Sequence, residues 1–244
     1  MLDIRALSKR FGGLHAVRDV ALAVPEGRIV ALIGPNGAGK TTTFAMIAGF
    51  IRPDAGTITF DGRDITGLRP DRIAGRGMVR TFQITQPFAG LTVAENIRVG
   101  AFLRTGDAAE ATARARETGT RLGLGPWLDR SAAALTVAGR KRLEVARALA
   151  TRPRLLLLDE VMAGLNPSEI HEIVALIRAI RDSGITILLI EHIMQAVAAL
   201  ADDVYVLAQG ALIAQGSPRD IANNPAVIEA YLGRGAAARL AADA

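Results

Sequence analysis

The segment from Gly34 to Thr42 has the residue types and spacing of a phosphate-binding loop. It reads Gly-Pro-Asn-Gly-Ala-Gly-Lys-Thr-Thr and fits the pattern G-x-x-x-x-G-K-[ST]. Glycines let successive backbone N–H groups turn toward one point, and the N-terminus of a following helix adds positive potential there. We expect Lys40 to reach the terminal phosphates of a nucleotide and the Thr41 hydroxyl to hold Mg²⁺.

Lysine is rare in this chain, which makes its presence at position 40 informative. Only Lys9, Lys40 and Lys141 are lysines among 29 basic residues. A compact ammonium is a point charge that a flat guanidinium does not replace. The choice of lysine here therefore favours phosphate binding.

Two acids, Asp159 and Glu160, end the aliphatic run Leu155 to Leu158, which predicts a buried strand. Ligands of open α/β sheets bind at the carboxyl ends of the strands. We expect Asp159 to complete the Mg²⁺ shell with Thr41, and Glu160 to polarise the attacking water. A solvated acidic pair at a strand end is the alternative, which the phosphate loop in the same chain disfavours.

His192 and Gln83 follow two further predicted strands. His192 comes just after Thr186 to Ile190 and is expected to bond the terminal phosphate and hold the water in line. No catalytic role is expected for His15 or His171. Gln83 ends the short strand that includes Arg80, and its amide is expected to touch both the metal shell and the helical insert that follows. The alternative is that Gln83 is a surface glutamine with no role in the site.

Length and composition limit the possible classes of protein. The chain has 244 residues, half of them apolar, which suits one large domain or two small ones. It contains no cysteine, which excludes disulfides and thiolate metal sites. The N-terminus lacks a secretory pattern and the aliphatic runs are shorter than the roughly 20 residues of a membrane span, so we expect a soluble chain. We interpret the formal net charge of +5 as scattered solvated arginines and not as a nucleic-acid-binding surface. The sequence has no block of basic residues, and it has few aromatic residues that could stack on bases.

The apolar pattern predicts strands alternating with helices. Strands are expected within residues 1–34, at 57–60, 155–158 and 186–190, and as a hairpin over 203–214. Residues 94–150 are rich in alanine, arginine and glutamate and are expected to be mainly helical. Helices are also expected over 170–180 and 225–232, with a frayed end from Gly233. This order predicts a parallel α/β sheet that a helical insert interrupts.

Together these motifs resemble the nucleotide-binding subunit of ABC transporters over essentially the whole chain. The resemblance implies an α/β fold: a P-loop NTPase (RecA-like) parallel-sheet core with an N-terminal antiparallel β subdomain and an inserted helical subdomain. The implied boundaries are residues 1–84 and 151–224 for the core, 85–150 for the helical subdomain and 225–244 for a C-terminal tail. Residues 163–167 resemble the family's dimer-contact loop.

The resemblance also implies ATP and Mg²⁺ as cofactors and a role for each site residue. Phe11 lies where the family stacks an aromatic ring on adenine, although burial in the core is the alternative. Catalysis is assigned to Glu160, His192, Lys40 and Gln83, and metal binding to Thr41, Gln83 and Asp159. The nucleotide is expected to contact Phe11, Asn36, Gly37, Ala38, Gly39, Lys40, Thr41, Thr42, Thr136 and Ala138.

Two departures from the family pattern concern the half of the site that serves a partner subunit. The signature, usually L-S-G-G-Q, falls on Leu135-Thr136-Val137-Ala138-Gly139. Thr136 keeps a hydroxyl that could donate to the γ-phosphate, and Ala138 could still offer its backbone N–H. Asn166 stands where many members carry aspartate. We expect slower or asymmetric ATP hydrolysis, not its absence.

Within ABC proteins, the chain most resembles one ATPase subunit of branched-chain (hydrophobic) amino-acid importers. The similar passages are residues 60–68, 80–83, 91–97 and 224–233. The implied partners are a second ATPase subunit (paralogue or self) in a head-to-tail dimer, two transmembrane permease subunits and, indirectly, a periplasmic binding protein, with no nucleic acid. The implied location is the cytoplasmic face of the bacterial inner membrane, as a peripheral subunit.

Several alternatives stay open at this stage. Related subunits serve urea or amide uptake, or lipid and lipopolysaccharide export. A soluble ABC ATPase of DNA repair or translation, a nucleotide-gated scaffold without turnover, and another P-loop enzyme such as a kinase are the other candidates. The transported solute does not follow from the sequence, because the ATPase never touches it.

Overall fold

The computed structural model describes residues 1–81 and 87–233, and its internal contacts divide the chain into two compact units. The first unit combines residues 1–70 with those from Thr186 onward, and the second spans Asp71–Ile185. The domain boundaries that the sequence predicts stay a prediction. No helix of the described residues is both long and apolar enough to cross a membrane.

The first unit begins with an antiparallel sheet. Its strand order is β2-β1-β4-β5, and the strands are β1 (Leu2–Phe11), β2 (Leu14–Val24), β4 (Ala55–Phe60) and β5 (Arg63–Asp64). In β2, Val20, Leu22 and Val24 are buried while the residues between them are exposed. This alternation is the one a strand with a single buried face requires, and it confirms the predicted N-terminal antiparallel sheet.

A second set of strands in this unit has the order β10-β9-β3-β8. β3 lies parallel to β8 and β9, and β10 pairs antiparallel with β9. Every residue of β3 and β8 is buried, which explains their unbroken aliphatic sequence. The bounds are β3 (Ile29–Ile33), β8 (Thr186–Ile190), β9 (Asp203–Ala208) and β10 (Ala211–Gly216).

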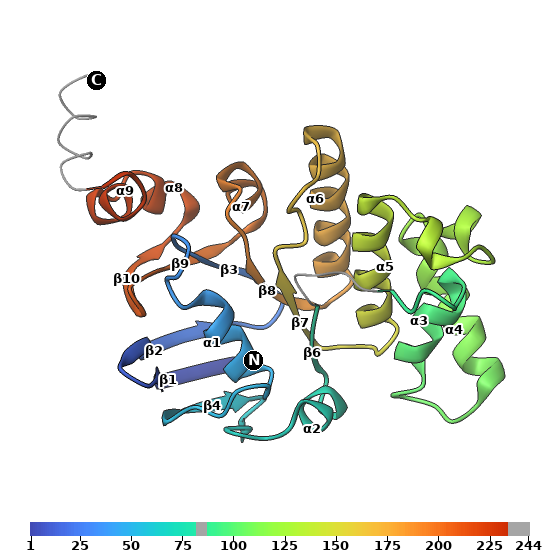
Figure 1. Ribbon diagram of the computed structural model, residues 1–244, viewed down its shortest axis with the longest axis horizontal. Helices are drawn as coiled ribbons and strands as arrows, with labels where there is room; N and C mark the ends of the chain where they lie inside the picture. Colours follow the sequence, from blue (N-terminus) through green and yellow to red (C-terminus); the bar gives the residue numbers. More distant parts are fainter. Residues whose placement is uncertain (82–86, 234–244) are drawn as a thin grey trace. The chain divides into compact units, whose positions relative to one another are not determined.

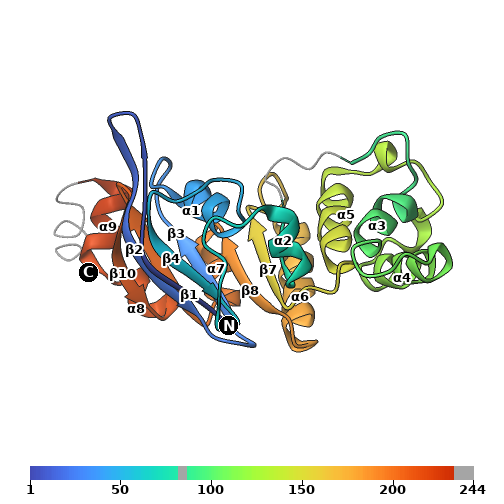
Figure 2. The ribbon, with the colours of Figure 1, turned by 90° about the horizontal axis from the view of Figure 1, so that it is seen from below.

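Helices cover this second set of strands. α7, α8 and α9 lie on one side of it, and α1 and the antiparallel strands lie on the other (Figures 1 and 2). The hairpin over 203–214 and the helix over 225–232 are confirmed. The bounds are α1 (Lys40–Ile47), α7 (Met194–Leu200), α8 (Pro218–Ala222) and α9 (Pro225–Leu232).

The second unit is mainly helical and also holds two parallel strands, β6 (Met78–Arg80) and β7 (Leu155–Asp159). α3, α4 and α5 pack against one another (Figure 2). Side chains cap four of the described α-helices in this unit: Thr92 and Asn166 form capping boxes, Asp107 accepts from two backbone N–H groups, and Thr136 accepts from one. The helices are α2 (Pro70–Gly75), α3 (Val93–Ala101), α4 (Ala108–Arg121), α5 (Val137–Leu149) and α6 (Pro167–Asp182), with short 3₁₀ turns η1 (Gly125–Trp127) and η2 (Ala132–Ala134).

Candidate functional site

The phosphate loop lies between a buried strand and a helix, as its sequence predicts. β3 ends at Ile33 and α1 begins at Lys40. Gly37 and Gly39 have φ angles of 77° and 103°, in the left-handed region that favours glycine. A Cβ at Gly34 would lie 2.0 Å from the carbonyl oxygen of Leu207, and one at Gly39 would lie 2.4 Å from that of Ala16. The glycines therefore allow both the turn and its close packing.

The N-terminus of α1 suits a phosphate group. Gly39 is its N-cap, provides no side-chain cap, and no acid lies in the first turn, so the backbone N–H groups there can meet an anion. The buried Lys40 Nζ donates to the carbonyl oxygens of Gly34 (2.6 Å) and Pro35 (3.0 Å), which places the ammonium over the loop. At the loop, Asn36 and Gly37 are exposed, Ala38 is buried, and Thr41 and Thr42 lie on the first turn of the helix, exposed and half-buried.

Two other predicted residues belong to the first unit. The Phe11 side chain is 47% exposed at the end of β1, which excludes the core alternative. Lys9 Nζ lies 5.6 Å from the centre of that ring. His192 is exposed just after β8, whose Ile190 pairs with Leu32 of β3. His192 and the phosphate loop therefore follow the carboxyl ends of neighbouring parallel strands.

In the second unit, Asp159 ends β7 as a buried carboxylate. Its side chain is 1% exposed, and Arg80 Nη2, on a 9% exposed side chain, donates to its Oδ2 at 2.6 Å. The other carboxylate oxygen, Oδ1, is buried and has no hydrogen-bond partner among the described residues. A buried polar atom requires a partner, and a carboxylate oxygen is a hard ligand of the kind Mg²⁺ prefers. The position of Asp159 thus fits its predicted metal role.

Glu160 adopts an unusual backbone conformation. Its φ angle is 48°, in the left-handed region that non-glycine residues rarely enter. The buried Lys141 Nζ of α5 donates to the carbonyl oxygen of Glu160 at 3.1 Å, while the Glu160 side chain is half-buried. Sequence reasoning missed both Lys141 and Arg80 as parts of the site. The scarcity of lysine was the signal that could have identified Lys141.

The altered signature forms the start of α5. Thr136 is the N-cap, and its Oγ1 accepts from the backbone N–H of Gly139 at 3.1 Å. That bond uses the oxygen as an acceptor and leaves the hydroxyl proton able to donate to a phosphate. Val137 is 55% exposed, and Ala138 beside it is half-buried. Asn166 caps α6, with its Oδ1 accepting from Glu169 N at 3.0 Å, a role that aspartate fills equally well.

The first unit therefore holds the phosphate loop, Phe11 and His192, and the second holds the acids and the signature. Gln83 lies outside the described residues. The described residues contain no group of three or more histidine, cysteine, aspartate or glutamate side chains that could hold a metal ion. The predicted Mg²⁺ site is of another kind, since it combines Asp159 with a threonine hydroxyl and phosphate oxygens.

The fold and the site define a P-loop nucleotide-binding protein, because a glycine-rich loop with an overlying lysine connects a buried strand to a helix. The family described as ABC transporter matches residues 17–163, and that described as branched-chain amino acid ATP-binding cassette transporter matches residues 211–237. The chain belongs to the ABC transporter ATP-binding family, whose members bind and hydrolyse ATP.

Known relatives resemble the chain over nearly its whole length. The high-affinity branched-chain amino acid transport ATP-binding protein LivG of Salmonella typhimurium is 45% identical, with 96% of this chain and 98% of LivG covered. The corresponding BraF of Pseudomonas aeruginosa is 43% identical with the same coverage. Among solved structures, a nucleotide-free ATP-binding cassette from an ABC transporter has a TM-score of 0.88 and 31% identity, and covers 96% of this chain and 99% of its own.

Proposed function

We propose that this ABC ATPase powers the uptake of branched-chain or other hydrophobic amino acids. The observation that carries the proposal is the match of residues 211–237 to the branched-chain amino acid cassette family. Relatives that are 43–45% identical are named for the same transport. The subunit would act at the cytoplasmic face of the membrane, bound to two permease subunits. A periplasmic binding protein would deliver the amino acid to those permeases.

The proposed assembly is a head-to-tail dimer of ATPase subunits. Each ATP would lie between the phosphate loop of one subunit and the Leu135–Gly139 segment of the other. Exposure of Phe11, Val137 and Thr41 supports this, because each is then available to a nucleotide or a partner. ATP binding would close the dimer, and hydrolysis with release of phosphate would open it.

Catalysis would depend on positioning and on neutralising phosphoryl charge. Thr41, Asp159 and Gln83 would hold Mg²⁺, which neutralises charge on the β- and γ-phosphate oxygens when bound. Lys40 would neutralise charge on the terminal phosphates. Glu160 would accept a proton from the attacking water, and His192 would bond the γ-phosphate and keep that water in line.

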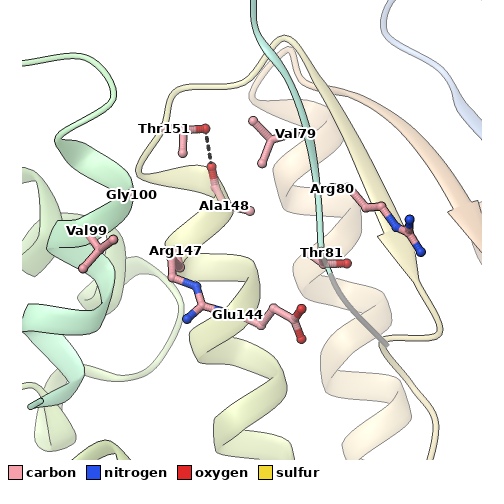
Figure 3. A pocket seen from close by; sticks show the side chains of 9 residues that line it. All are labelled: Val79, Arg80, Thr81, Val99, Gly100, Glu144, Arg147, Ala148 and Thr151. Carbon is pink, nitrogen blue, oxygen red and sulfur yellow. Dashed lines mark hydrogen bonds between the residues drawn. The ribbon is translucent and has the colours of Figure 1, made fainter. Parts of the chain in front are cut away.

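The permease would contact the second unit near α3. Large apolar side chains are exposed there, which is typical of an interaction surface: Phe88, Val99, Phe102 and Leu103. Val99 also lines a small cavity of about 130 Å³ between α3, α5 and β6. Figure 3 shows Glu144 and Arg147 extending from α5, and Thr81 just after β6, two positions before the predicted Q-loop residue Gln83 in the sequence. A permease segment at this cavity would therefore contact Thr81, which is two positions before Gln83 in the sequence.

The first test is Mg²⁺-dependent ATP hydrolysis by the purified chain at rising protein concentration, beside Glu160→Gln. We expect turnover that rises faster than linearly with concentration. General-base catalysis contributes about 10²–10⁴-fold, so turnover should fall by that order in the variant, while ATP binding is kept. Equal turnover by the variant and the wild type would rule out Glu160 as the base.

Transport itself needs the membrane partners. Reconstitution with the permeases of a branched-chain amino acid importer should couple hydrolysis to leucine uptake. The relative that serves lipopolysaccharide export in Acidithiobacillus ferridurans is 36% identical, so the permeases of such a system are the matched control. Stimulation by those export permeases alone would contradict the proposed solute class.

A further inference from the structure

The end of β1 carries Phe11, the residue proposed to stack on adenine, and it extends past its neighbour β4. The ladder between β1 and β4 ends at the pair Ser8–Ala55, so the last three residues of β1 lie beyond it (Figure 2). There β1 continues as a hairpin with β2, and an isolated two-stranded hairpin is only marginally stable. The position of Phe11 near the tip of the hairpin therefore depends on contacts from outside it.

Asp54, just before β4, supplies two such contacts through its carboxylate. Its Oδ1 accepts from Lys9 Nζ at 2.6 Å, and its Oδ2 accepts from the backbone N–H of Arg10 at 2.7 Å. The backbone N–H of Asp54 in turn donates to the carbonyl oxygen of Ser8 at 2.9 Å. The bond from Lys9, and then the bond from Arg10, lower the pKa of the Asp54 carboxyl below its usual range. The carboxylate is therefore charged at neutral pH and holds both partners.

Asp54 thereby fixes the ammonium group of Lys9 against Phe11. Lys9 Nζ lies over the Phe11 ring, 5.6 Å from its centre, a distance at which the face of an aromatic ring attracts a cation. The Lys9 side chain is only 17% exposed, so it is packed and not extended into solvent. Lys9 is one of only three lysines, and the other two lie at the phosphate loop and beside the proposed catalytic base. Each lysine of the chain thus accompanies a residue assigned to the nucleotide site.

We propose that Asp54 is a positioning residue for the nucleobase: it holds Lys9 over one face of Phe11 and so orients the ring before ATP binds. The inference rests on the proposed stacking of Phe11 on adenine and adds the residue that prepares it. A side chain that is already ordered loses less conformational entropy when a ligand binds, and ordering one mobile side chain costs a factor of roughly two to ten in affinity. Because Asp54 holds the Lys9 ammonium, Lys9 acts on the ring and not on the phosphates.

Calorimetry on the full-length chain with Mg²⁺ would compare ATP with inorganic tripolyphosphate, which has the phosphates but no base. We expect Asp54→Asn to weaken ATP binding roughly two- to tenfold and to leave tripolyphosphate binding unchanged. Asp54→Glu keeps the carboxylate and should recover part of the lost affinity. Asp3→Asn is the matched control, because it removes the same charge and breaks an exposed ion pair with Arg5 toward the other end of β1. It should change the binding of neither ligand.

A double variant separates action through Phe11 from a direct contact with the nucleotide. Phe11→Ala should weaken the binding of ATP and not of tripolyphosphate, and adding Asp54→Asn to it should cause no further loss. Equal losses for both ligands in Asp54→Asn, or a further loss in the double variant, would overturn the inference. Wild-type ATP binding by Asp54→Asn beside weakened binding by Phe11→Ala would overturn it alone. Wild-type ATP binding by both single variants would also contradict the proposed stacking of Phe11.

Discussion

At the scale of single residues, Arg80 controls the electrostatics around Asp159. The two side chains form an ion pair at 2.6 Å and are almost fully buried. Removing one partner of a buried pair leaves an uncompensated charge, which costs about 3–5 kcal/mol. We therefore expect Arg80→Met to lower the free energy of unfolding by that amount in denaturant titrations. Arg80→Lys keeps the charge and should lower the free energy of unfolding much less.

Arg80 should also affect the Mg²⁺ requirement, because it and the metal interact with the same carboxylate. Without the guanidinium, Asp159 should bind Mg²⁺ more readily. We expect Arg80→Met to need less Mg²⁺ for half-maximal hydrolysis, and Mg²⁺ with ATP to restore more stability to this variant than to the wild type. An unchanged Mg²⁺ dependence on both measures would show that the ion pair does not compete with the metal.

The sequence predicts a residue's role well when the role follows from local spacing. Lys40, Thr41 and His192 each lie where their motif and the end of a strand place them. Arg80 and Lys141 could not be identified in this way. The Arg80 pair depends on the β6–β7 register, in which Arg80 lies opposite Leu157, and the Lys141 bond depends on how α5 packs. Both are tertiary contacts that have no sequence motif.

At the scale of elements, Lys141 connects the signature helix α5 to Glu160, the proposed catalytic base. Its bond to the Glu160 carbonyl oxygen supports a backbone conformation that is strained at that residue. Misplacement of a reacting group by about 1 Å can cost 10²-fold in rate. We expect Lys141→Met to lower kcat roughly 10–100-fold with little change in the KM for ATP.

The conservative variant Lys141→Gln tests whether the hydrogen bond is responsible. Its amide can still donate, so it should recover part of the activity. If Lys141 only stabilised the fold, both variants would unfold more easily while the kcat of the folded protein stayed at the wild-type value.

Close packing of α3 on α5 depends on Gly100. A Cβ there would lie 2.1 Å from the carbonyl oxygen of Arg147. The α5 backbone at Arg147 cannot move away from this Cβ as a flexible side chain could. Gly100→Ala should therefore destabilise the protein by about 1–3 kcal/mol, measured by thermal or denaturant unfolding. Gly106→Ala is the control, because a Cβ at Gly106 meets nothing within 4 Å. Equal stability of the two variants would contradict the packing argument.

Elements with a strong apolar pattern were predictable, and short polar ones were not. The strand over 186–190 and the helix over 225–232 have the predicted bounds. β5 has two residues, both exposed, and therefore no hydrophobic pattern. The region 94–150 is helical as predicted, but its division into α3, α4 and α5 depends on the caps Thr92, Asp107 and Thr136, which composition alone does not reveal.

At the scale of the whole molecule, the sequence of the chain predicts one half-site that matches the family pattern and one that is altered. The phosphate loop, Asp159, Glu160 and His192 match the family, whereas the signature Leu135–Gly139 does not. In the proposed head-to-tail dimer, these halves serve different ATP molecules. A paralogous partner with an ordinary signature would therefore complete the site that contains Glu160 of this chain, and the other site would be the weaker one.

Restoring the signature tests this asymmetry. We expect the triple change Val137→Gly, Ala138→Gly and Gly139→Gln to raise the turnover of the chain on its own several-fold. A Cβ at position 139 would lie 3.2 Å from the flexible Leu135 side chain, so a small shift accommodates it. The two new glycines lie in the first turn of α5 and should cost up to about 1 kcal/mol each in stability. Higher ATPase activity together with a lower melting temperature would therefore indicate that the altered signature favours helix stability over contact with the γ-phosphate bound to the partner. Unchanged activity would mean that the backbone N–H groups and Thr136 of the altered signature already suffice for that contact.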